Sequence, residues 1–152
     1  MNSIDAEALL TEAGIRPTAN RLLVVRELEG RDEALSLHDL ERRLPWVERS
    51  SVFRVLQTLG SHGLLHEIDD GSGSVKYELC TDHEHTHDGL HDDQHVHFYC
   101  EQCRHTFCLS DTPIPQLQLP DGFVQNSANF VIHGLCPQCA AKACKIFHKK
   151  FS

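Results

Sequence analysis

The chain of 152 residues lacks any long hydrophobic run, and its longest uninterrupted aliphatic stretch is the segment 22–25. A membrane-spanning helix needs about 20 apolar residues, so we expect no membrane partner. The N-terminal sequence MNSIDAEALL carries acidic residues without a basic flank, which argues against a secretory signal. Together these absences predict a cytoplasmic protein.

The sequence also lacks the short motifs of several common enzyme classes. It contains no His-Glu-x-x-His metalloprotease motif, no Gly-x-Ser-x-Gly nucleophile elbow and no glycine-rich phosphate loop. These absences argue against a hydrolase or a nucleotide-dependent enzyme. We predict that the protein is not an enzyme.

Positive charge is scarce, because 14 Lys and Arg face 22 Asp and Glu and leave a formal net charge of −8. This balance, taken alone, argues against a general nucleic-acid binder. Lysine is absent before position 71, however, and all eight basic residues in that part are Arg. Arginine suits bidentate contacts with phosphates and bases, so we expect these Arg residues, rather than the average charge, to meet DNA.

Cysteine is absent from residues 1–79, whereas residues 80–152 contain all seven Cys and nine of the twelve His. This uneven distribution predicts two domains, residues 1–80 and residues 81–152. In a reducing compartment thiols are not expected to rest as structural disulfides, and an odd number cannot all pair with one another. Metal ligation or catalysis is the better explanation of the Cys pairs.

Residues 1–80 follow the pattern of helices and then a β-hairpin. Capping residues and apolar periodicity predict helices over 3–13, 17–28, 36–44 and 50–61. The alternating segments LLHEID and VKYELC predict two strands around a flexible Asp-Gly-Ser-Gly-Ser turn at 70–74. This order of elements is typical of a winged helix-turn-helix domain.

The helix over 50–61 is the candidate DNA-recognition helix. Its apolar residues recur at helical spacing, at Val52, Val55, Leu56 and Leu59. Polar side chains project from the opposite face, at Ser50, Arg54, Gln57 and Ser61. One interpretation is a solvated surface helix; the other is a helix in the major groove, with Arg54 at a phosphate or guanine. Its position directly before the hairpin favours the second.

The second domain carries two Cys-x-x-Cys motifs separated by 32 residues, with cysteines Cys100, Cys103, Cys136 and Cys139. Four thiolates at the corners of a tetrahedron are the closed geometry of structural zinc. Unligated thiols or a redox pair are the alternative, but two motifs are better explained by a single ion. Four thiolates leave no open coordination position, so this site does not suit catalytic zinc.

A second candidate metal site combines residues from both domains. His95 and His97 alternate, so on a strand both imidazoles face one side. Cys80 ends the second strand of the hairpin, and His66 lies within the first. A metal bound by these four residues would couple the angle of the DNA-binding domain to metal concentration. The alternatives are an ordinary exposed His66 and a flexible chelating tract formed by His83, His85, His87 and His91.

Four segments carry a recognisable combined pattern: GIRPTANR at 14–21, SSVFRVLQTLGSHGLL at 50–65, HVHFYCEQC at 95–103 and HGLCPQC at 133–139. Their order and spacing resemble the ferric uptake regulator family of bacterial metal-dependent repressors over nearly the whole chain. The resemblance implies an α+β fold with an N-terminal winged helix and a C-terminal α/β dimerisation domain. It also implies a homodimer that binds palindromic double-stranded DNA operators when its sensing site is filled.

The resemblance also implies roles for individual residues. The four motif cysteines match the family's structural zinc ligands, and Phe53-Arg54 falls where the recognition helix usually carries Tyr-Arg. The sensing site of the zinc-responsive members corresponds to His66, Cys80, His95 and His97. The expected DNA contacts are Arg16, Arg21, Ser50, Ser51, Phe53, Arg54 and Gln57.

The ligand set indicates which metal is sensed. A soft thiolate favours zinc over iron as the regulatory ion, although Glu78 matches an acidic ligand of iron-sensing members and keeps Fe2+ open. We therefore predict a zinc-responsive repressor of metal-uptake genes. The alternatives are an iron-responsive repressor, a peroxide sensor of the same fold, and a His-rich metal buffer or carrier.

The sequence departs from the family pattern in four places. Segment 81–94 is longer and richer in His than the family norm. The segment TPIPQLQLP at 112–120 stands where a helix usually follows two strands, and its three prolines oppose a helix. Ala128 occupies the position where a further metal site needs His, so we do not expect that site. Cys108 stands where an acidic ligand is common and is a further candidate for the sensing site.

Overall fold

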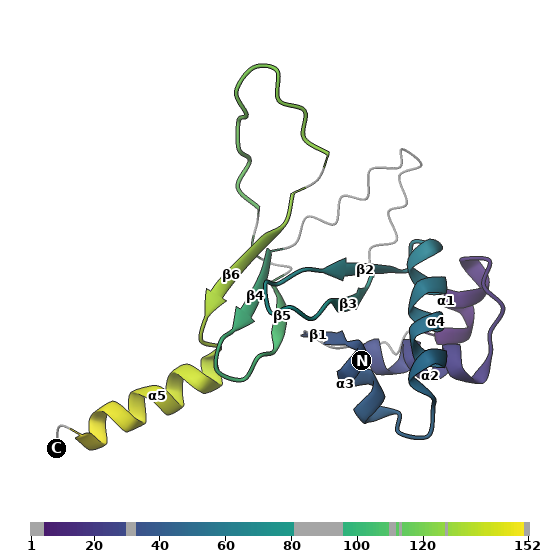
Figure 1. Cartoon of the computed structure of the whole chain (residues 1–152), viewed down its shortest axis with the longest axis horizontal. Coiled ribbons are helices and arrows are strands. Elements are labelled where there is room, and N and C mark those ends of the chain that lie inside the picture. The colour runs from purple at the N-terminus through teal and green to yellow at the C-terminus, as the bar shows by residue number, and fades with distance from the viewer. Residues whose placement is uncertain are drawn as a thin grey trace. The chain divides into compact units, whose positions relative to one another are not determined.

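The computed structural model describes residues 5–29, 33–80, 96–109, 112, 114–126 and 128–150, with side chains described to residue 144. The chain divides into two compact units, residues 1–93 and 94–152, and each is described by itself (Figure 1). The domain boundary after residue 80 stays a prediction, because residues 81–95 lie outside the described part.

The first unit contains the helices α1 (Ala6–Glu12), α2 (Ala19–Leu28), α3 (Leu37–Arg43) and α4 (Arg49–Ser61). The predicted helix start at Ser3 is wrong, because Asp5 is extended and serves as the N-cap. Its carboxylate accepts hydrogen bonds from the backbone N–H groups of Glu7 and Ala8, which have no partner within the helix. The helix therefore begins at Ala6.

Helix α4 packs against α2 and α3 (Figure 1). The four predicted apolar residues of this helix, Val52, Val55, Leu56 and Leu59, are all buried. Each such side chain contributes about 1.5–3 kcal/mol on full burial. After the helix, Gly63 takes a left-handed φ of 75°, which confirms it as the stop signal.

Three short strands complete the first unit: β1 (Glu33–Ser36), β2 (Leu65–Ile68) and β3 (Lys76–Leu79). Strands β2 and β3 form the predicted antiparallel hairpin. Strand β1 was not expected; it pairs antiparallel with β3 and places Ser36 opposite Lys76. Its last residue, Ser36, is also the N-cap of α3, so the sequence pattern at this point predicts only the start of a helix. The result is the predicted winged helix-turn-helix, with a three-stranded sheet.

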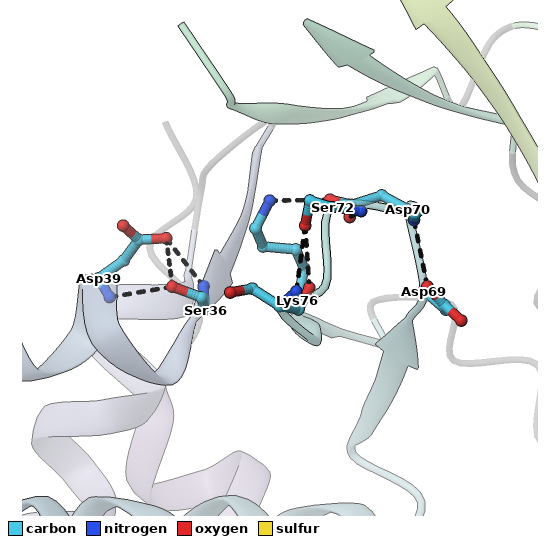
Figure 2. A network of polar contacts seen from close by, with 8 residues as sticks. Ser36, Asp39, Asp69, Asp70, Ser72 and Lys76 are labelled. Atoms are coloured by element: carbon cyan, nitrogen blue, oxygen red, sulfur yellow. Dashed lines mark hydrogen bonds and ion pairs between the residues drawn. The ribbon is translucent and has the colours of Figure 1, made fainter. Parts of the chain in front are cut away.

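The turn between β2 and β3, residues 69–75, is called the wing turn. Its composition predicts flexibility, but side-chain bonds fix it. The Oδ2 atom of buried Asp70 lies 2.8 Å from Nζ of Lys76, which is also buried (Figure 2). The other oxygen of Asp70 accepts the backbone N–H of Ser72 at 2.9 Å. Burying both charges together fixes where the wing turn leaves the sheet.

The second unit contains β4 (Val96–Cys100), β5 (Thr106–Leu109), β6 (Phe130–Gly134) and α5 (Pro137–Lys150). Strand β4 pairs antiparallel with β5 and parallel with β6. Residues 114–120 contain no helix, as the prolines predict, and the described residues between β5 and β6 form neither helix nor strand (Figure 1). Throughout the described residues, no helix combines the length and apolar character needed to cross a bilayer.

Candidate functional site

The two Cys-x-x-Cys motifs meet at one end of the second unit. The first begins at the last residue of β4, and the second joins β6 to the first turn of α5. The backbone N–H of Glu101 donates to the carbonyl of Gly134 at 2.9 Å and joins the two motifs. Arg104 takes a left-handed φ of 63°, which turns the first motif back so that its N–H reaches the carbonyl of Cys100. These bonds bring together Cys100, Cys103, Cys136 and Cys139.

The four sulfur atoms have the spacing of a tetrahedral metal site. All four Sγ atoms lie within 4.8 Å of one another, and those of Cys103 and Cys136 are 3.9 Å apart. A zinc ion with Zn–S bonds of about 2.3 Å places tetrahedral sulfurs about 3.8 Å apart. The observed spacing therefore fits a single zinc ion, as the motifs predict.

Two thiols of this cluster, those of Cys100 and Cys139, have strongly shifted pKa values. Burial raises the pKa of Cys100, but the backbone N–H groups of Cys103, Cys136 and Gln102 outweigh it and lower that pKa to about 6. The hydrogen bond with Cys136, followed by burial, raises the pKa of Cys139 to about 12. One thiolate is thus stabilised before a metal arrives, whereas another needs the metal to displace its proton.

The first unit holds the wing half of the predicted sensing site. On β2, the Nδ1 atom of His66 lies 3.1 Å from Sγ of Cys80, which directly follows β3. Its Nε2 atom lies 3.0 Å from Oε2 of Glu78, the residue opposite it on β3. The imidazole is therefore in contact with a thiol and a carboxylate at once, and all three side chains are half-buried. His66 is not an ordinary exposed strand residue.

The motifs do not predict the contact between His66 and Glu78, although the register of the predicted hairpin would have indicated it. Two antiparallel strands around the turn at 70–74 place these residues opposite each other, and such pairs contact directly. The two remaining predicted ligands belong to the second unit. His97 is buried on β4 opposite Cys108, while His95 lies outside the described residues. The complete four-residue site stays a prediction.

The predicted DNA contacts lie on the solvent side of the first unit. On α4, the side chains of Ser50, Phe53, Arg54 and Gln57 are exposed and Ser51 is half-buried. Nε of Arg54 donates to the carbonyl of Ser50, which holds the guanidinium along the helix surface. Before α2, exposed Arg16 accepts a hydrogen bond at its carbonyl from Nη1 of Arg21. The polar face that the periodicity predicts is available for contact.

A winged helix-turn-helix unit and a second unit with a four-cysteine cluster define a metal-binding DNA-binding protein. Comparison with known proteins agrees with this class. The family model described as ferric uptake regulator family matches residues 12–133. The chain belongs to this family. Its members are regulators, which confirms that the chain is not an enzyme.

Individual relatives include sensors named for different metals. A zinc uptake regulation protein of Mycobacterium tuberculosis is 28% identical over 138 residues, covering 86% of this chain and 98% of that protein. A ferric uptake regulation protein of Synechococcus elongatus is 27% identical over 144 residues, covering 88% and 91%.

Solved structures confirm the predicted fold. A zinc uptake regulator complexed with zinc and DNA has a TM-score of 0.59 at 23% identity, covering 91% of this chain and 93% of that one. The ferric uptake regulator of Vibrio cholerae has a TM-score of 0.60 at 19% identity, covering 87% and 100%.

Proposed function

We propose that the protein is a zinc-dependent transcriptional repressor that acts in the cytoplasm. As a homodimer it binds palindromic operators of metal-uptake genes when zinc is plentiful. The observation that carries this proposal is the contact between His66 and Cys80 on the hairpin that follows the recognition helix. Imidazole and thiolate are both good zinc ligands, and here they meet beside the DNA-binding element.

The structural ion of this proposal is held by the four motif cysteines. Bound there, zinc supplies a closed crosslink between the end of β4 and the start of α5. Besides the pairing of β4 with β6 and the bond from Glu101 to Gly134, the described part of this unit has only a small buried cluster at this point. It consists of Cys100, Cys136 and Cys139, packed with Phe98, Cys103 and Phe107. We assign this site to folding rather than to sensing.

The regulatory ion is held by His66 and Cys80 together with His95 and His97. Backbone bonds connect this wing half to the recognition helix. The N–H of Cys80 donates to the carbonyl of Leu64 at 2.9 Å, and the N–H of Leu64 donates to the carbonyl of Leu59 in α4 at 3.0 Å. Fixing Cys80 therefore constrains α4 through two hydrogen bonds. In a dimer, this constraint sets the spacing of two recognition helices, which successive major grooves require.

Exposed apolar side chains on the second unit support the homodimer. Six large ones are solvent-facing there: Leu117, Leu119, Phe123, Val124, Ile132 and Leu135. The exposed fraction reaches 86% at Val124 and 68% at Phe123. Exposed apolar side chains in such number are typical of interfaces between subunits. A second copy of the chain is the partner that would cover it.

An iron-responsive repressor of the same fold is the second candidate function. The observation that favours it is the 3.0 Å approach of Glu78 to Nε2 of His66. A carboxylate is a harder ligand than a thiolate and suits Fe2+ better. If Glu78 rather than Cys80 bound the metal, the preference of the site would shift from zinc toward Fe2+.

A selection from randomised DNA duplexes tests the proposal and separates the two metals. The purified protein is incubated with the library at buffered free zinc, at buffered Fe2+ without oxygen, and without added metal. We expect a palindromic sequence to be enriched with zinc and not without metal. Enrichment with Fe2+ alone would favour the iron-responsive function, and no enrichment under any condition would reject a repressor.

A further inference from the structure

A shallow notch opens in the first unit between the wing turn and the starts of α3 and α4. It has a volume of about 240 Å³. Its lining includes polar Ser36, His38, Arg49 and Ser74 and apolar Val75 and Tyr77. None of the predicted DNA contacts lines this notch, and no carboxylate is among its lining residues. Its one permanently charged side chain is the guanidinium of Arg49, so the notch suits an anion.

One carboxylate beside the notch already contacts Arg49 and His38. Oε2 of Glu41 on α3 lies 2.6 Å from Nη1 of Arg49 and 3.9 Å from Nδ1 of His38. All three side chains are well exposed, with Glu41 39% and Arg49 56% accessible. Exposed ion pairs of this kind stabilise little and are screened by salt. A stronger anion can therefore replace the carboxylate without disturbing the fold.

The walls of the notch are fixed by the two polar networks of Figure 2. On one side, Ser36 and Asp39 form a reciprocal capping box at the start of α3. On the other, the Asp70–Lys76 pair anchors the wing turn. Within that turn, Ser72 accepts the N–H of Ser74 and donates to its carbonyl. Because both walls are held before any ligand binds, the notch is preorganised.

We propose that this notch binds a backbone phosphate of duplex DNA through Arg49, and that Glu41 competes with that phosphate as an internal anion. The inference rests on the proposed function, since it concerns the same DNA-binding unit. In helix-turn-helix complexes the helix before the recognition helix crosses the DNA backbone, and α3 holds that place here. Phosphate contacts fix the register of a protein on the duplex without reading sequence.

The placement of the notch gives a reason for the wing turn and the recognition helix to hold a fixed position relative to each other. A phosphate held between Ser74 and Arg49 would be contacted by the wing turn and by the first residue of α4 at once. Glu41 then limits affinity, because its carboxylate must leave Arg49 before the phosphate binds. Such an internal competitor lowers the affinity for DNA whose bases make no specific contacts with the recognition helix.

The test uses zinc-loaded full-length protein and a mixed-sequence duplex of about 30 base pairs, long enough for two heads one helical turn apart. Fluorescence anisotropy gives the affinity at salt concentrations from about 50 to 200 mM. Variants are Arg49→Gln, Glu41→Gln and the double change. Arg26→Gln on α2 and Glu7→Gln on α1 remove the same charges at exposed positions away from the notch. Circular dichroism and zinc content show that each variant is folded.

Losing one phosphate contact per head should lower the salt slope of the Arg49→Gln dimer by about two. Raising salt from about 50 to 200 mM should then cost this variant roughly tenfold less affinity than it costs the wild type. Glu41→Gln should bind several-fold tighter than both the wild type and Glu7→Gln. That gain should vanish in the double variant, because the two side chains act on one contact.

Two results overturn the proposal in distinguishable ways. If Arg49→Gln keeps the wild-type salt slope, or loses no more than Arg26→Gln, the notch does not hold a phosphate although the protein still binds DNA. If the zinc-loaded wild type binds neither this duplex nor any sequence of the randomised library, the repressor function fails and the notch proposal fails with it.

Discussion

The Sγ atoms of Cys103 and Cys136 lie 3.9 Å apart, although the two residues are 33 positions apart in the chain. This approach joins the turn after β4 to the start of α5. Backbone pairing of β4 with β6 also ties these segments, but the described buried cluster around them is small. A metal crosslink at this point should therefore supply much of the stability of the unit.

Cys136→Ser tests the structural site. The variant should lose about one zinc ion per protomer and unfold its second unit, because binding energy at such sites is folding energy. Elemental analysis and thermal denaturation measure both effects. Cys144→Ser, at an exposed cysteine of α5, is the matched control and should behave as wild type. Equal zinc content in the two variants would remove Cys136 from the site.

Cys80→Ala separates sensing from folding. The variant should keep the structural zinc ion and its thermal stability, because Cys80 lies outside the four-cysteine cluster. It should lose the zinc dependence of DNA binding, since His66 then has no thiolate beside it. Zinc stoichiometry and anisotropy are measured on the same sample. A full zinc response in Cys80→Ala would place the sensing site elsewhere.

Asp70→Asn should destabilise the first unit by about 3–5 kcal/mol, because the Lys76 ammonium is left buried without its carboxylate. Urea unfolding measures the free energy of unfolding. Replacing both residues, as in Asp70→Asn with Lys76→Met, should recover part of the loss. If the single variant matched the wild type, the pair would not anchor the wing turn.

Phe123→Glu with Val124→Glu should shift the protein from dimer to monomer, because two charges enter the apolar surface of the second unit. Sedimentation velocity measures the oligomeric state. Trp46→Glu is the control, since Trp46 is 70% exposed in the first unit. A dimer that survived the double change would show that this surface is not the interface.

The elements that the sequence predicts well are those that depend on local spacing. The four apolar residues of α4 repeat at helical intervals, so their burial follows from the pattern alone. The four-cysteine cluster is also predictable from local spacing, because two residues between cysteines bring both thiols to one ion. The other two ligands are found in the sequence as a second Cys-x-x-Cys motif, at Cys136 and Cys139.

Features that depend on tertiary burial escaped prediction. The Gly and Ser content of the wing turn predicts flexibility, but Asp70 and Lys76 are buried together only once β1 pairs with β3. Strand β1 itself is four residues long and carries no alternation that its sequence could reveal. The contact of His66 with Glu78 follows from hairpin register, which motif spacing does not supply.

The most direct test of a zinc-dependent repressor is operator affinity as a function of free zinc. Anisotropy with the selected palindromic duplex is measured across buffered zinc concentrations, with the structural ion kept in place throughout. We expect that filling the second site raises affinity by about 5- to 150-fold, and that Cys80→Ala abolishes the rise. Equal operator affinity with and without free zinc would contradict it.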